Sequence, residues 1–198
     1  MVITLSILSS VLFFATFTVA RPAAKSAILP TSDLPSPSGL TLQYIALGVG
    51  TQNYTCATST TASVPVPDGA LATLYDATTF FSKPGHQSAM SSLLDSNLAL
   101  KPNKDLDVLG HHYFVPPLTP TFDLGATLLS AKRLAKVPSP TGAIDWLYLV
   151  DDLSGRSHGL KAVYRVETIG GKAPATCDGL DTSKVLTVNY AAEYWLYN

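Results

Sequence analysis

Residues 160–169, LKAVYRVETI, decide the fold class more clearly than any other part of the chain. Similar side chains recur there at every second position, as in a β-strand, whose successive side chains point to opposite faces. One face carries Leu160, Ala162, Tyr164, Val166 and Thr168. The pair Gly170-Gly171 ends the pattern, which predicts a strand followed by a turn. Residues 187–197, TVNYAAEYWLY, are rich in aromatic side chains and predict a last strand.

Short apolar runs separated by glycine and proline continue this pattern through the rest of the chain. Further strands are expected over residues 42–50, 52–57, 109–115 and 144–150. Residues 86–98 are expected to form one short helix, whereas 127–135 fit neither a helix nor a strand well. The predicted fold class is therefore all-β, an antiparallel β-sandwich or β-barrel with at most one or two short helices.

The start of the chain differs in composition from the rest. Residues 1–20, MVITLSILSSVLFFATFTVA, are apolar and uncharged and end in small residues, which is typical of a secretory signal peptide cut after Ala20. Residues 21–40 contain four prolines and predict an extended Pro-rich leader or linker. Residues 41–198 then form a single β-rich domain. We expect a secreted, extracellular protein without a membrane span after signal cleavage, and a retained signal anchor is the alternative.

Export would allow two modifications of the chain, a disulfide and an N-linked glycan. Cys56 and Cys177 are the two cysteines of the chain, and in an oxidising compartment we expect them to form one disulfide. That bridge would tie an early strand to the loop before the last one. Asn53-Tyr54-Thr55 is an N-glycosylation sequon, which predicts a surface glycan on Asn53.

Charge and motifs exclude several functional classes. Charged residues make up 14% of the 198 residues, and the net charge is −1. Without a basic stripe, nucleic acid and anionic membrane surfaces are not expected partners. The sequence holds no G-x-S-x-G, no HExxH, no phosphate loop and no Cys/His cluster. We therefore predict no catalytic residue, no metal and no cofactor.

Eight short pieces in a fixed order carry a resemblance to known proteins. The pieces are LQYIA (42–46), QNYTC (52–56), PDGA (67–70), GHHYF (110–114), IDWL (144–147), VYRVET (163–168), GGKAP (170–174) and YAAEYWLY (190–197). The region from about residue 40 to residue 198 resembles a widespread family of secreted proteins, common in fungi and also found in bacteria, that is classified as a domain of unknown function. The resemblance implies a secreted β-rich domain and carries over no catalytic residue.

Fungal members of that family are sometimes labelled malate dehydrogenase, a label that the residues do not support. Hydride transfer with a nicotinamide cofactor needs a G-x-G-x-x-G turn between a strand and a helix. The nearest match, residues 48–53 (GVGTQN), lacks the third glycine and is followed by a second predicted strand. Gly48 and Gly50 are better explained as hairpin or bulge glycines.

Aromatic side chains next to acids supply the candidate ligand-binding residues. The candidates are His111, Tyr113, Asp123, Asp145 and Trp146. The pair Asp145-Trp146 is of a kind common in sugar sites, because the indole stacks on a pyranose ring while the acid accepts hydroxyl protons. The structural alternative is that Trp146 and Trp195 fill the core.

The adjacent histidines 111 and 112 suggest a second kind of site. Neighbours on a strand point to opposite faces, so only one of the two rings is expected inside. Metal binding would need His86 or His158 as a further ligand.

The expected function is non-enzymatic binding of a glycan or a host protein at the cell wall or a host interface. One alternative is a polysaccharide hydrolase, which needs two carboxyls about 5 to 9.5 Å apart across one cleft. The available acids are Asp123, Asp145, Asp151, Asp152, Glu167 and Glu193. The other alternative is a metal-binding protein that uses its histidines.

Overall fold

The computed structural model describes residues 27–86, 89–101 and 105–198, which form eight strands and two short helical turns. The strands are β1 (Leu42–Thr55), β2 (Val66–Asp76), β3 (Val108–Val115), β4 (Thr119–Asp123), β5 (Leu128–Val137), β6 (Trp146–Asp151), β7 (Ala162–Gly170) and β8 (Leu186–Tyr197). The helical turns are α1 (Thr78–Phe81) and η1 (Met90–Ser92). The predicted all-β class is confirmed. Among the described residues, no helix has the length and apolar character that crossing a membrane requires.

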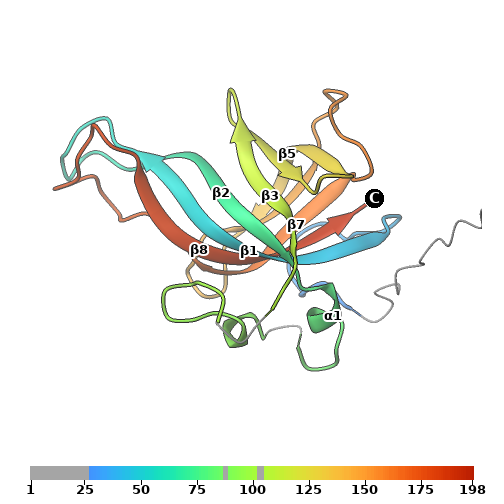
Figure 1. Ribbon diagram of the computed structural model, residues 1–198. Coiled ribbons are helices and arrows are strands. Elements are labelled where there is room, and N and C mark those ends of the chain that lie inside the picture. The colour runs from blue at the N-terminus through green and yellow to red at the C-terminus, as the bar shows by residue number, and fades with distance from the viewer. Residues whose placement is uncertain (1–26, 87–88, 102–104) are drawn as a thin grey trace, which may run out of the picture.

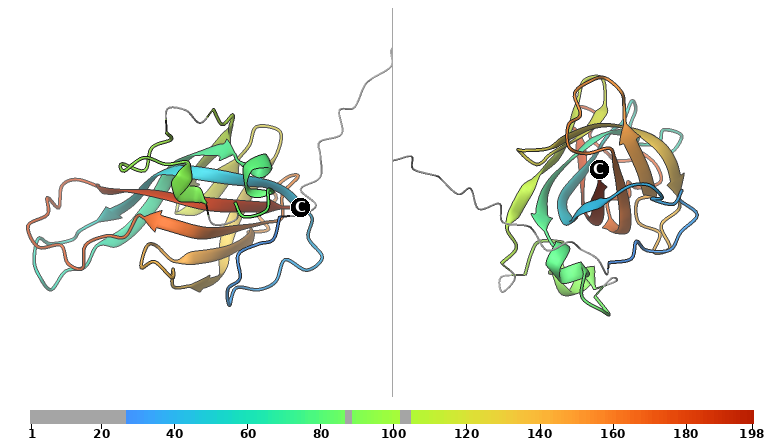
Figure 2. Two further views of the ribbon diagram at one scale, coloured as in Figure 1. Left: turned by 90° about the horizontal axis from the view of Figure 1, so that it is seen from below. Right: turned by 90° about the vertical axis from the view of Figure 1, so that its right-hand side faces the viewer.

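The sheet is a closed barrel, which decides between the two architectures left open by the sequence. Each strand pairs antiparallel with the next one along the chain, and β8 returns to pair with β1 (Figure 1). That closing ladder runs from Leu42 opposite Tyr197 to Tyr54 opposite Leu186. Figure 2 shows the strands curving around a common axis when the molecule is turned by 90° about the vertical axis. Closure leaves both strands of the pair without a free edge along this ladder.

Alternation along each strand divides the side chains into a barrel interior and an outer layer. On β8, Tyr190, Ala192, Tyr194 and Leu196 belong to the interior cluster. A second buried cluster, on the outer face, contains Ala191, Trp195 and Tyr197 of β8. From Tyr190 to Tyr197 both faces of this strand are therefore buried, as the largely apolar sequence of this stretch requires.

Two segments without strands cover the outer face. The connection between β2 and β3, which carries α1 and η1, lies beneath β1 and β8 in Figure 1 and contributes Phe81 and Met90 to the outer cluster. Residues 27–40 carry no strand or helix, yet Leu34 is buried in the same cluster. The Tyr164 hydroxyl donates a hydrogen bond to the carbonyl of Pro35 at 2.8 Å. The predicted signal peptide lies outside the described residues.

Three local predictions differ from the structure or were left open. The two strands expected within 42–57 are one continuous strand, β1. A side chain at Gly48 would collide with the ring of Tyr194, and one at Gly50 would collide with the backbone of Leu71, so these glycines permit close packing inside a strand. The helix expected over 86–98 is reduced to η1, and the ambiguous 127–135 region is β5.

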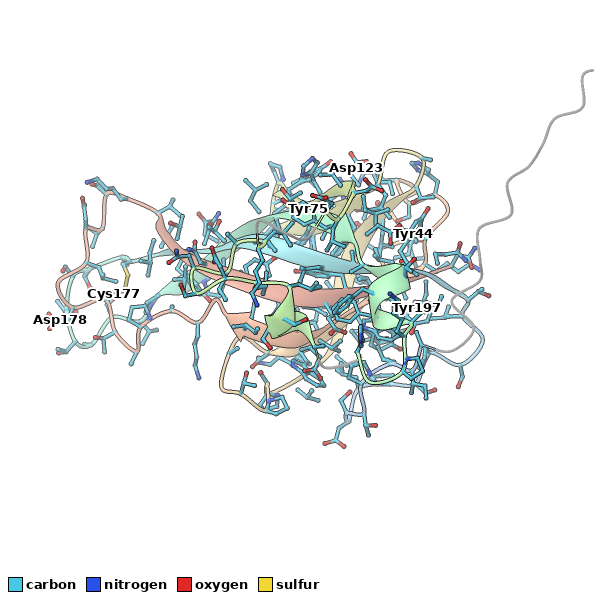
Figure 3. All side chains as sticks on the ribbon, turned by 60° about the horizontal axis from the view of Figure 1, so that its bottom comes forward. Tyr44, Tyr75, Asp123, Cys177, Asp178 and Tyr197 are labelled. Atoms are coloured by element: carbon cyan, nitrogen blue, oxygen red, sulfur yellow. A yellow bond between two sulfur atoms is a disulfide. The ribbon has the colours of Figure 1, made fainter. Side chains whose placement is uncertain are left out.

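The Cys56–Cys177 disulfide is confirmed. It joins the residue after β1 to the loop before β8, and Figure 3 labels Cys177 beside Asp178 at the far end of the loops that project from the barrel. The two cysteines are 121 positions apart, so the bridge closes a loop that contains β2 to β7.

Removing this bridge is expected to lower the free energy of unfolding markedly. The chain-entropy model gives about 5 kcal/mol for a loop of this length. The double variant Cys56→Ser/Cys177→Ser should unfold at a lower urea concentration than the wild type. Reduction of the wild type should reproduce the shift, and reduction of the variant should cause none. Equal midpoints for variant and wild type would contradict a stabilising role.

Candidate functional site

A cavity of about 690 Å³ lies within the barrel and opens to solvent. All eight strands contribute to its walls, including Phe114 of β3, Phe122 of β4, Leu147 of β6 and Tyr194 of β8. The opposite part of the interior is filled by apolar side chains such as Leu129. A pocket of this size fits a small organic molecule.

The ladder between β4 and β5 is short. β4 pairs with β5 only from Thr121 opposite Ser130 to Asp123 opposite Leu128. Beyond Ser130, β5 runs on to Val137 without pairing to β4, although its other edge pairs with β6. Leu118, Thr119, Pro120, Lys132, Arg133 and Lys136 line the cavity around this gap.

Arg165 is the charged group at the inner wall. It lies on β7 between the outward-facing Tyr164 and Val166, and it is 9% exposed. Its Nε and Nη2 both donate to the main-chain carbonyl of Asp145, at 3.2 and 2.8 Å. This double contact fixes the plane of the guanidinium, because its donors form a rigid fork.

Neighbouring polar side chains are held in place around Arg165. Gln52 is buried, donates through Nε2 to the carbonyl of Gly69 at 2.9 Å, and lies with Oε1 3.5 Å from Nη1 of Arg165. The Tyr54 hydroxyl donates to the carbonyl of Gly171 at 2.7 Å. Backbone acceptors thus orient both side chains, which keeps the polar wall of the cavity in one arrangement.

Two tyrosines extend this polar wall. The hydroxyls of Tyr190 and Tyr194 lie 2.8 Å apart and share a hydrogen bond. Burial raises the pKa of Tyr194, and the positive charge of Arg165 opposes part of that rise. Both hydroxyls therefore stay protonated at neutral pH and serve as hydrogen-bonding groups rather than charges.

His112 supplies a neutral ring to the same cavity. The ring is 3% exposed and stacks on Phe122, with ring centroids 4.2 Å apart. Burial lowers the pKa of His112 to about 4, so the ring is neutral at physiological pH. Its Nδ1 lies 3.0 Å from the carbonyl of Thr121, which requires the proton on Nδ1. The lone pair of Nε2 is then left as a hydrogen-bond acceptor.

Residues 37–198 match a family described as "Protein of unknown function (DUF3455)". The chain belongs to this family. The resemblance seen in the sequence is thereby confirmed as membership of a family of unknown function. No curated protein and no solved structure matches the chain. The name malate dehydrogenase has no support, since Gly48 and Gly50 lie inside β1 rather than between a strand and a helix.

The candidate residues expected from the sequence fall into three places. His111, Tyr113 and Asp123 lie together on the outer face of β3 and β4, where His111 is paired with Asp123 and the Tyr113 hydroxyl lies 3.4 Å from a carboxylate oxygen of Asp123. Asp145 lies at the cavity and pairs with Lys136 at 2.9 Å. Trp146 is packed in the outer cluster and is 4% exposed. Their role in ligand binding stays a prediction.

Sequence reasoning missed Arg165, Gln52 and Tyr194. One signal was available, because Arg165 is the single charge within the apolar run AVYRV of residues 162–166. A charge inside a strand buried on both faces needs polar partners, and such groups gather at sites.

The acids available for hydrolysis that line the cavity are engaged by basic side chains. Asp145 and Asp152 both line the cavity, but Asp145 pairs with Lys136 and Asp152 pairs with Arg156 at 3.3 Å. Within the described part of the chain, no group of three or more His, Cys, Asp or Glu side chains is placed to hold a metal.

Glu193 is a buried carboxyl outside the cavity. It lies on β8 between the inward Ala192 and Tyr194, so it points to the outer face, where its side chain accepts a hydrogen bond from Nε1 of Trp195 at 2.9 Å. Its other carboxyl oxygen is buried without a partner among the described residues. Burial raises the pKa of Glu193 to about 8, and the negative charge of Glu167 adds to the rise.

Stability is therefore expected to fall with rising pH because of Glu193. Its pKa is higher in the folded state, about 8, than the ordinary value of 4.5, so its proton favours folding below pH 4.5 and this contribution is lost between pH 4.5 and 8. The slope from this group is up to about 1.4 kcal/mol per pH unit. In Glu193→Gln, the melting temperature relative to wild type should rise between pH 5 and pH 9.

The matched control is Asp178→Asn, which changes an exposed acid. Its melting temperature should follow that of the wild type across the same pH range. A Glu193→Gln curve parallel to the wild type would show that this carboxyl does not titrate in that window.

Proposed function

We propose that this protein is a secreted, non-enzymatic binding protein that holds a small, partly apolar molecule inside its barrel. The observation that carries the proposal is the cavity of about 690 Å³, whose apolar walls end in a fixed set of buried polar side chains. Sites for small molecules combine these two properties, because apolar walls supply affinity and a few oriented polar groups supply specificity.

The hydrogen bonds around the cavity support binding rather than reaction. Arg165, Tyr54 and His112 each contact a main-chain carbonyl, which fixes their orientation. The carboxylates that line the cavity are paired with basic side chains. A retained ligand would meet a rigid polar wall, and preorganised groups of this kind lower the entropic cost of binding.

Placement outside the cell is the second part of the proposal. The disulfide between Cys56 and Cys177 suits an oxidising compartment, and the apolar segment 1–20 has the composition of a signal peptide. We place the action of the protein at the cell wall or a host interface, where an exported binding protein meets small molecules released by either.

The cavity favours a compact molecule over a long glycan. A polysaccharide site needs exposed rings along a groove, whereas the indole of Trp146 is packed in the outer layer. Tyr113 and His111 lie on the outer face, away from the cavity, and would have to act there.

Secretion and glycosylation predict the mass of the mature protein. Protein recovered from the medium of a eukaryotic host should begin after Ala20 and should lose mass on treatment with an N-glycan-removing amidase. Asn53→Gln should abolish that loss, because Asn53 carries the sequon. Intact-mass spectrometry measures both, and an unprocessed amino terminus or an unmodified Asn53 would contradict the corresponding part of the proposal.

Occupancy of the cavity is testable with the neutral fluorescent probe N-phenyl-1-naphthylamine. Wild-type protein should raise the fluorescence of the probe and bind it saturably. Leu147→Trp places a larger ring in the cavity, so the dissociation constant should increase by about tenfold or more.

Leu134→Trp adds the same ring at a side chain that is 61% exposed and does not line the cavity. This variant should bind the probe like the wild type. Circular dichroism and melting temperatures establish that both variants fold. Failure of the wild type to bind the probe, or equal weakening in both variants, would overturn the cavity as a binding site.

A further inference from the structure

The charge of Arg165 lacks an acidic side-chain partner. None of the ion pairs among the described residues includes Arg165. Asp145 contacts Arg165 only through its main-chain oxygen, and its carboxylate pairs with Lys136 instead. A buried charge is costly unless it is paired, so a negative group bound in the cavity would be stabilised by Arg165.

The hydrogen-bonding capacity of Arg165 is also incompletely used. A guanidinium has five N–H donors. Two of them reach the carbonyl of Asp145, one is directed to Gln52 across 3.5 Å, which is a long contact, and one is engaged by the side chain of Tyr194. One donor is left, and the long Gln52 contact can be exchanged for a contact to an occupant of the cavity. A carboxylate is the group that accepts from such a fork most favourably.

The charges around the opening act in the same direction. Lys132, Arg133, Lys136 and Lys172 line the cavity together with Arg165, against two acids, Asp145 and Asp152. Since the whole chain carries a net charge of −1, this excess of positive charge belongs to the cavity. Clefts of one sign attract ligands of the other sign and speed their capture.

The remaining walls define the body of the ligand. Phe114, Phe122, Ile144 and Leu147 present aromatic and aliphatic surface to the cavity. The free lone pair on Nε2 of His112 accepts a hydrogen bond from a neutral hydroxyl or amide N–H. An acid with an aromatic or aliphatic body matches this combination, whereas a phosphorylated sugar or a polyvalent anion leaves the apolar walls without contacts.

We propose that the ligand is a small organic acid whose carboxylate pairs with Arg165 while its aromatic or aliphatic body occupies the barrel, an inference that rests on the proposed function of the cavity. Arg165 is then the residue that selects acids over their neutral analogues.

Two probes with one body separate the charge from the cavity. 8-Anilinonaphthalene-1-sulfonate is N-phenyl-1-naphthylamine with an added anionic sulfonate. Wild-type protein should bind the sulfonate about ten times more tightly than the neutral probe. Arg165→Gln should remove this preference, so that the variant binds the two probes with similar affinity. Lys161→Gln, which removes a positive charge at an exposed residue outside the cavity, should keep the preference.

A carboxylate pair tests the ligand class itself. Displacement of N-phenyl-1-naphthylamine by trans-cinnamate should require about tenfold less compound than displacement by cinnamyl alcohol, and Arg165→Gln should bring the two together. Arg165→Lys should keep part of the preference, because it retains the charge and loses the fork.

The outcomes distinguish the two proposals. Equal binding of acids and neutral analogues by the wild type would overturn the assignment of an acid and leave the cavity function standing. A preference that persists in a folded Arg165→Gln variant would overturn the role of Arg165. Absence of binding of the neutral probe would overturn the cavity function instead. The wild-type comparison decides the ligand class even where a variant fails to fold.

Discussion

The pairing of β8 with β1 is the contact on which the rest of the molecule depends. It joins the last strand to the first over almost their whole lengths and turns a row of antiparallel strands into a barrel with an inside. The register of this pairing also decides which side chains of β8 face the cavity. Tyr190 and Tyr194 point inward, while Glu193 and Trp195 point to the outer layer. A shift by one residue would exchange the two sets and replace the tyrosine wall with a carboxyl.

Much of the fold could be predicted from the sequence, because its signals are local. Alternation in β7 and aromatic content in β8 predict strands without knowledge of their partners. The continuity of β1 could not be predicted, since Gly48 and Gly50 are turn signals in their own neighbourhood. These positions require glycine because Tyr194 and the backbone of β2 lie against them, and both come near only after the barrel closes. The choice between sandwich and barrel depends on the same long-range pairing.

The residues that line the candidate site could be predicted only in part from the sequence. His111, Tyr113 and Trp146 were singled out by residue type, whereas the cavity is lined by the next residue along, His112, Phe114 and Leu147. Alternation places neighbours on opposite faces but does not say which face is the interior. On β7 both faces are buried, so hydrophobicity gives no answer, and Arg165 was overlooked for that reason. Asp145 was a candidate as the acid beside Trp146, and it lines the cavity from the loop before β6 rather than from the strand expected there.

The disulfide keeps the chain in one covalent molecule after a single proteolytic cut between the two cysteines. A peptide bond cut anywhere between Cys56 and Cys177 leaves two fragments, each still attached to one end of the bridge. The connection between β2 and β3, which covers the outer face, lies within that interval. A nicked barrel would therefore persist as a two-chain molecule, with its fragments held by one covalent bond and by the ladders between strands. On a reducing gel such a molecule would separate into two bands, although it had behaved as one protein in solution.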